Sequence, residues 1–122
     1  MHYISLLVGH SSMDIHDRAR VLANKSNMSQ KHSCLILRKG KIISEGYNYP
    51  METFCHKYSL HAEVVALIGL KNMPKWWLKE CTMFVFRISN TDPDSFRMSK
   101  PCADCQKAII LAGIGKVFYT CD

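Results

Sequence analysis

The stretch TMFVFRI, residues 82–88, is a strongly apolar run that predicts a strand in a sheet covered on both faces. Downstream, residues 101–112 have a helical pattern that begins at Pro101 and ends near Gly113. Residues 116–120, KVFYT, then predict a last strand. A strand, a helix and a second strand in this order predict a crossover connection with parallel strand pairing.

Upstream of residues 82–88 the pattern predicts two more helices and a hairpin. A helix is expected over residues 13–28, and a hairpin over 33–38 and 41–46 around a tight turn at Lys39-Gly40. A loop is expected to about residue 57. A second helix is expected over 60–72, with Ser59 as a candidate N-cap and Pro74 at its end. Residues 90–100 are polar and predict a loop. The apolar N-terminus predicts either a first core strand or an extended segment that leads into the first helix.

Bulk properties indicate an ordinary globular domain. The 122 residues are 48% hydrophobic and 21% charged, with no repeat or linker, so one domain over residues 1–122 is expected. The sequence has no run of 18 apolar residues, so no membrane-spanning helix is expected. The N-terminus lacks the basic leader of a signal peptide. We therefore expect no membrane partner. The net charge of +6 fits an anionic partner, such as a nucleotide phosphate or a nucleic acid.

The six cysteines do not favour a disulfide framework, because no secretory leader is evident and core residues are plentiful. Two of them, Cys102 and Cys105, have metal-ligand spacing. The other four are expected to be mainly buried free thiols: Cys34, Cys55, Cys81 and Cys121. Unpaired thiols need a reducing environment, so an intracellular location, cytoplasmic or nuclear, is expected.

Two short motifs stand at the predicted starts of the second and third helices. They are HAE, residues 61–63, and PCADC, residues 101–105. Cysteines three apart in a first helical turn lie on one side of it, where free N–H groups favour thiolate. Parallel crossovers bring such helix starts to one edge of the sheet. His61, Cys102 and Cys105 are therefore three candidate zinc ligands, which would leave the fourth position for water, as in catalytic zinc sites.

Glu63 lies on the same turn as His61 but points differently, so it is the candidate proton carrier rather than a ligand. Zinc lowers the pKa of a bound water to about 7, and a carboxylate beside it can move the protons. Alone, a Cys-x-x-Cys pair also suits a structural zinc or a redox pair. A structural zinc with Cys55 or His56 as fourth ligand would leave Glu63 without a role.

His-x-Glu followed by Pro-Cys-x-x-Cys is the signature of zinc deaminases. With residues 39–48, KGKIISEGYN, and residues 113–117, GIGKV, it makes the chain resemble the cytidine deaminase-like superfamily over nearly its whole length. The most similar branch contains deoxycytidylate deaminases and tRNA adenosine deaminases. The resemblance implies a three-layer α/β/α fold with a central mixed sheet of about four strands. It also implies substrate contacts by Asn48 and by the backbone of Ala62, and a homodimer or higher oligomer.

Three features depart from these relatives. YPME, residues 49–52, stands where deoxycytidylate deaminases have a loop with Gly and Pro, and Lys100 stands where the tRNA enzymes have Glu. The sequence ends at Asp122, where relatives often continue with a helix and a fifth strand, so the domain is C-terminally short. Some members bind a second, structural zinc, for which Cys55 and His56 are candidates here, although no further Cys-x-x-Cys pair supports such a site.

These observations leave three functional hypotheses. The first and favoured one is a zinc-dependent hydrolytic deaminase of a cytosine nucleotide or nucleoside, with dCMP as the preferred substrate. In it, zinc hydroxide attacks C4 and Glu63 is the proton shuttle. The second is a deaminase of single-stranded DNA or of RNA such as tRNA, for which the aromatic residues at 47, 49, 76 and 77 are candidate stacking groups. For the two tryptophans, Trp76 and Trp77, packing at a helix end is the favoured role. The third is a non-catalytic, zinc-stabilised binding module, against which the presence of Glu63 argues.

Overall fold

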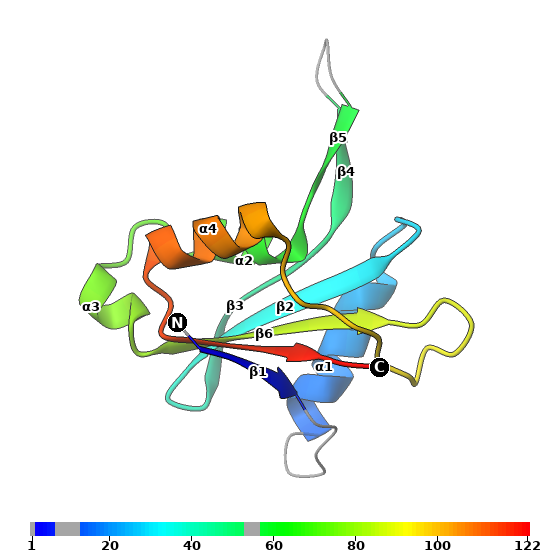
Figure 1. The fold of residues 1–122 in the computed structure, drawn as a ribbon, viewed down its shortest axis with the longest axis horizontal. Coiled ribbons are helices and arrows are strands. Elements are labelled where there is room, and N and C mark those ends of the chain that lie inside the picture. The colour runs from blue at the N-terminus through cyan, green and yellow to red at the C-terminus, as the bar shows by residue number, and fades with distance from the viewer. Residues whose placement is uncertain (1, 7–12, 53–56) are drawn as a thin grey trace.

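A mixed five-stranded sheet forms the centre of the protein in the computed structural model, which describes residues 2–6, 13–52 and 57–122. The strand order is β1-β7-β6-β2-β3 (Figure 1). β1 with β7 and β7 with β6 pair in parallel, whereas β6 with β2 and β2 with β3 pair antiparallel. The bounds are His2–Leu6 for β1, Lys116–Thr120 for β7, Cys81–Ile88 for β6, Lys31–Arg38 for β2 and Lys41–Tyr47 for β3.

Helices cover both faces of this sheet. Alternate side chains of β2 and β6 point to opposite faces, so Leu35 and Phe86 pack against α1 while Cys34 and Val85 face the other helices. The helix bounds are Met13–Asn24 for α1, Ala62–Ile68 for α2, Lys75–Leu78 for α3 and Ala103–Ala112 for α4. The three-layer α/β/α arrangement implied by the resemblance is confirmed.

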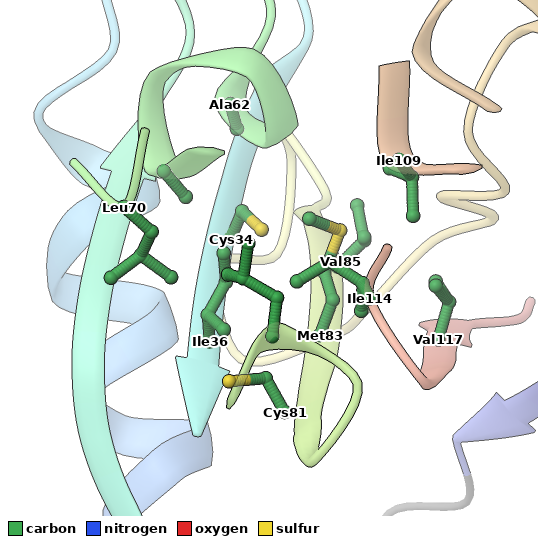
Figure 2. Packing of buried hydrophobic residues seen from close by; sticks show 12 residues of the cluster. Cys34, Ile36, Ala62, Leu70, Cys81, Met83, Val85, Ile109, Ile114 and Val117 are labelled. Carbon is green, nitrogen blue, oxygen red and sulfur yellow. The ribbon is translucent and has the colours of Figure 1, made fainter. Parts of the chain in front are cut away.

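The larger part of the core lies between the sheet and the layer of α2, α3 and α4. Figure 2 shows how its side chains meet between the two layers. Cys34 of β2 and Val85 of β6 come from the sheet, and Ala62 of α2 and Ile109 of α4 come from the helices. All four are fully buried. This packing fixes the starts of α2 and α4 relative to the sheet.

The predicted strands are all present. Of the two alternatives for the N-terminus, the first strand is the one observed, and β1 is the fifth member of the sheet, at the edge beside β7. The hairpin turn is as expected, because Lys39 and Gly40 have φ values of 51° and 78°. Two consecutive left-handed residues are the requirement of a type I′ turn, which matches the twist of the flanking strands.

Several predicted boundaries were wrong. The stretch predicted as a loop contains a second sheet, formed by β4 (Tyr49–Glu52) and β5 (Lys57–Leu60). Ser59 lies in β5 and is not the N-cap of α2, a position that His61 takes. α1 ends at Asn24 and α2 at Ile68, both earlier than predicted, and α4 begins after Pro101 with Cys102 as N-cap.

The β4–β5 ribbon extends away from the three layers (Figure 1). It begins directly after Asn48 and ends directly before His61, so its base lies at the site described below. Pro74, expected at the end of the second helix, instead precedes α3 as its N-cap. In the described part of the chain no helix is both long and apolar enough to cross a membrane.

Candidate active site

The start of α2 is held against β3 by a close backbone approach. A Cβ atom on Gly46 would lie 2.8 Å from the carbonyl oxygen of Ala62 and 2.9 Å from the backbone nitrogen of Ala66, so only glycine fits. The hydroxyl of Ser44 donates a hydrogen bond of 2.6 Å to the carbonyl oxygen of Ala66. These two contacts fix where His61 and Glu63 lie.

The start of α4 is held by a buried network around Ser99. Its backbone N–H donates to the carbonyl of Thr120 at 3.0 Å, and its hydroxyl donates to the carbonyl of Val85 at 2.7 Å. One turn into α4, the amide of Gln106 donates to the carbonyl of Pro101 at 2.9 Å. The chain that leads to Cys102 is therefore tied to two strands and to its own helix.

The two helix starts bring His61, Cys102 and Cys105 together. Their ligand atoms all lie within 4.8 Å of one another. Nδ1 of His61 is 3.2 Å from Sγ of Cys105 and 3.6 Å from Sγ of Cys102. Tetrahedral zinc with ordinary Zn–N and Zn–S bonds places such atoms about 3.5 Å apart. One imidazole and two thiolates at these separations fit Zn²⁺, with a fourth position left for another ligand.

Glu63 lies beside this cluster and is 5% exposed. Burial raises the pKa of its carboxyl above the ordinary value, although its own backbone N–H, His61 and a hydrogen bond with Cys105 oppose that shift. A carboxyl whose pKa is moved toward neutrality exchanges protons more readily at physiological pH. Its position and its pKa both suit proton transfer.

The buried thiols around the cluster resist ionisation without a metal. Burial raises the pKa of Cys105, and the nearby Glu63 carboxylate and Cys102 raise it further. Burial likewise raises the pKa of Cys34, which lies on β2 near Glu63 and Cys105. Cys105 therefore favours the neutral thiol, and a bound cation would stabilise its thiolate form.

A cavity of about 360 Å³ opens beside the cluster. The two residues that the resemblance assigns to substrate binding, Asn48 and Ala62, both line it. Asn48 also has a structural role, because it connects to the backbone before and at the start of β2. Its Oδ1 accepts a 2.9 Å hydrogen bond from the N–H of His32, and its Nδ2 donates a 2.7 Å hydrogen bond to the carbonyl of Gln30. An amide has one further donor and acceptor site to offer a ligand.

His32 and Arg87 line the cavity wall but were not among the sequence-based candidates, whereas Lys100, which also lines it, was noted only because it stands where the tRNA enzymes have Glu. His32 and Arg87 face each other across the β2–β6 pair. Burial, with a smaller contribution from Arg87, lowers the pKa of His32 to about 4, so His32 is neutral at physiological pH. Only the register of the two strands would have indicated that these residues share a face with the metal cluster.

Other sequence-based candidates have mixed outcomes. Cys34 and Cys81 are buried free thiols as expected, and Cys121 is half-buried. Trp77 packs against the core, as favoured for the tryptophan pair, whereas Trp76 is 67% exposed. The second-zinc candidates, Cys55 and His56, lie outside the described residues.

A three-layer α/β/α domain with a His-Cys-Cys cluster and an adjacent buried glutamate at two helix starts defines a zinc-binding class of protein. A family model described as "Cytidine and deoxycytidylate deaminase zinc-binding region" matches residues 11–121. The chain belongs to this family. Among proteins with curated functional descriptions, none matches significantly.

Solved structures of deaminases have a similar fold. The dCMP deaminase of cyanophage S-TIM5 in its apo form superposes with a TM-score of 0.65 at 23% identity, covering 93% of this chain and 84% of that one. A cytidine deaminase from Burkholderia pseudomallei gives 0.60 at 17% identity over 84% and 76%. Guanine deaminase from Bacillus subtilis gives 0.59 at 25% identity over 93% and 65%.

Proposed function

We propose that this protein is a zinc-dependent hydrolytic deaminase of a cytosine nucleotide, with dCMP as the preferred substrate. The observation that carries the proposal is the buried Glu63 beside the cluster of His61, Cys102 and Cys105, at the wall of a cavity of about 360 Å³. Ligand cavities of about 300–1,000 Å³ are usual for small molecules.

The proposed division of labour follows from where each group lies. His61, Cys102 and Cys105 hold the zinc, which when bound supplies a Lewis acid and lowers the pKa of a coordinated water to about 7. Glu63 takes a proton from the attacking water and delivers protons to N3 of the ring and to the leaving amine. Water and the amino compound thereby become the carbonyl compound and ammonia, so no further reactant is needed.

The substrate would be oriented by two residues of the cavity wall, Ala62 and Asn48. The first N–H groups of a helix have no partner within it, and Ala62 is the first residue of α2. Its backbone N–H is therefore placed to bond an acceptor on the base, as the family resemblance implies. The spare donor and acceptor of Asn48 would contact the sugar.

Similar deaminases support a cytosine compound as the substrate. A structure of the S-TIM5 enzyme, 22% identical to this chain, is described as a complex with dCMP and dUMP. Guanine deaminase is also among the similar folds, so guanine belongs in the test.

A substrate panel tests the proposal. Zinc-loaded protein is incubated with dCMP, deoxycytidine, cytidine, dCTP, guanine, single-stranded DNA and tRNA, and released ammonia and base conversion are followed. We expect the highest kcat/KM on dCMP, with activity retained at high salt. Activity on polymers alone, falling steeply with salt, would instead identify a nucleic-acid deaminase. Absence of turnover on every substrate with zinc bound would contradict an enzymatic role.

A further inference from the structure

The cavity wall contains a guanidinium without a counter-ion. Three of the five arginines form ion pairs with acidic side chains: Arg18 with Glu45, Arg20 with Asp17 and Arg38 with Glu80. Within the described residues, no carboxylate pairs with Arg87. Its Nε is shielded from solvent and makes no hydrogen bond there. A shielded donor that lacks a partner is costly, so a ligand that supplies the acceptor gains the full benefit.

The position of Arg87 follows from the sheet. Cys81, Met83 and Val85 on β6 pack into the core under α2 and α4, so the alternation of the strand places Arg87 on the same face. It lies where that core ends and the cavity begins. His32, the cross-strand neighbour of Arg87, is neutral at physiological pH. His32 therefore neither neutralises the charge of Arg87 nor adds a second positive charge beside it.

Glu63 does not neutralise Arg87 either. It is the only acidic residue of the cavity wall among the described residues. Within the part of the chain that the structure describes, no ion pair joins Glu63 to Arg87. The cavity wall therefore holds both the candidate proton carrier and a guanidinium that is not paired with it.

Lys100 adds a second positive charge to the same wall. It is exposed and lies directly after Ser99, whose bonds to β6 and β7 fix the local backbone. A planar guanidinium binds two phosphate oxygens at once, and a lysine ammonium acts as a point charge on the same group. The two cations are complementary to a doubly charged terminal phosphate.

We infer that Arg87 and Lys100 form an anion subsite that takes the terminal 5′-phosphate of a nucleoside monophosphate while its base lies at the metal cluster. This inference rests on the proposed deaminase function and adds the residues that select a phosphorylated substrate. A free monophosphate is favoured over a polynucleotide because Arg87 is half-buried inside the cavity. In addition, no tyrosine, tryptophan or phenylalanine is among the described residues of its wall, whereas single-strand binding usually relies on stacking.

Kinetic discrimination between dCMP and deoxycytidine tests the subsite. The variants are Arg87→Met, Arg87→Lys and Lys100→Met, with Arg97→Met as the matched control, because Arg97 is an exposed arginine outside the cavity wall. We expect Arg87→Met to lower the ratio of kcat/KM for dCMP to that for deoxycytidine by about 10- to 100-fold. Arg87→Lys should recover part of this loss, Lys100→Met should lower the ratio less, and Arg97→Met should leave it unchanged.

Three kinetic outcomes would overturn the inference. Equal losses on dCMP and deoxycytidine would indicate that Arg87 only supports the fold. An unchanged ratio in Arg87→Met would remove its role in phosphate binding. A kcat/KM for a single-stranded oligodeoxynucleotide above that for dCMP, falling with Arg87→Met, would assign the subsite to a polymer. The zinc content and the thermal midpoint of each variant show whether it is folded. If Arg87→Met fails to fold, the dCMP-to-deoxycytidine ratio of Arg87→Lys is compared with that of the wild type instead.

A binding experiment separates this inference from the proposed function. Titration calorimetry compares dUMP, deoxyuridine and inorganic phosphate on the zinc-loaded protein, which requires no turnover. We expect dUMP to bind at least 10-fold more tightly than deoxyuridine, and this difference to vanish in Arg87→Met. If dUMP and deoxyuridine bind equally while cytosine compounds are still deaminated, the subsite is wrong and the function stands. If dUMP binds through Arg87 but no substrate is turned over, the function is wrong and the subsite stands.

Discussion

The Nδ1 atom of His61 lies 3.2 Å from the sulfur of Cys105, although 44 positions separate the two residues in the chain. The contact exists because α2 and α4 lie on the same face of the sheet and begin at the same edge of it. Cys105 also acts on the Glu63 carboxyl, whose pKa it lowers. One thiol therefore connects the candidate metal ligands with the candidate proton carrier.

Replacing the carboxyl of Glu63 should remove turnover without removing zinc. Glu63→Gln keeps the shape of the side chain but cannot accept the proton, so we expect kcat on the best substrate to fall by at least about 10²- to 10⁴-fold. Zinc content, measured by atomic absorption, should stay at one per chain. Glu80→Gln is the matched control, because Glu80 is an exposed glutamate on the surface. Residual activity of Glu63→Gln close to that of the control would refute the proton-transfer role.

Zinc binding should release protons, because the pKa of Cys105 is raised by burial and by the neighbouring Glu63. Cys105 must lose its proton to bind, so at least about one proton per zinc should appear, and affinity should fall by at least about 10-fold per pH unit on acidification. Calorimetry in buffers of different ionisation enthalpy measures the proton count. Cys105→Ala should abolish stoichiometric binding, whereas Cys81→Ala, which removes a thiol outside the cluster, should not. A proton count near zero would mean that the thiolates exist before the metal arrives.

The parts of the fold that were predicted depend on local chemistry. Lys39-Gly40 specifies its own turn, and the motifs at residues 61–63 and 101–105 each begin a helix that a strand follows. Handedness of the crossovers then brings the two motifs together. The family resemblance supplied the helices on both faces, which the alternation of β2 and β6 confirms.

The parts that were missed depend on contacts distant in sequence. The loop prediction for the segment up to about residue 57 is wrong, because pairing of residues 49–52 with 57–60 forms the ribbon of β4 and β5. For the N-terminus, the first-strand alternative is the one observed, but its parallel pairing with β7, at the other end of the chain, could not be predicted from residues 2–6 alone. Arg87 lay inside a predicted strand and His32 directly before one, and only the register of β2 against β6 places both at the cavity.

Adding a methyl group to Gly46 should disturb the site through the backbone of α2. The new Cβ would lie 2.8 Å from the carbonyl oxygen of Ala62, which cannot move without shifting the helix start. We expect Gly46→Ala to lower the free energy of unfolding by about 1–3 kcal/mol. Activity and zinc affinity should fall with it, as measured by denaturant unfolding, calorimetry and kinetics.

Gly40→Ala is the control for this prediction. Gly40 has a positive φ of 78° and nothing within 4 Å of an added Cβ, so the substitution strains the turn without touching α2. It should cost about 1–2 kcal/mol of stability and leave zinc affinity unchanged. If Gly40→Ala reduces zinc affinity as much as Gly46→Ala, the loss reflects general instability rather than a displaced helix start.

Acid should destabilise the protein through His32. Burial, then Arg87, lowers the pKa of His32 to about 4 from an ordinary value of 6.5, so the unfolded state binds the proton first as the pH falls. The stabilising contribution is therefore complete above pH 6.5 and is lost progressively between 6.5 and about 4, on the order of 3 kcal/mol in total. Urea unfolding of the metal-free protein with chelator present, at pH 7 and pH 5, measures it without interference from zinc release. His32→Gln should flatten this part of the pH profile, and Arg87→Met should raise the pKa of His32 seen by NMR while burial keeps it below 6.5. An identical pH profile in wild type and His32→Gln would show that another group causes the acid sensitivity.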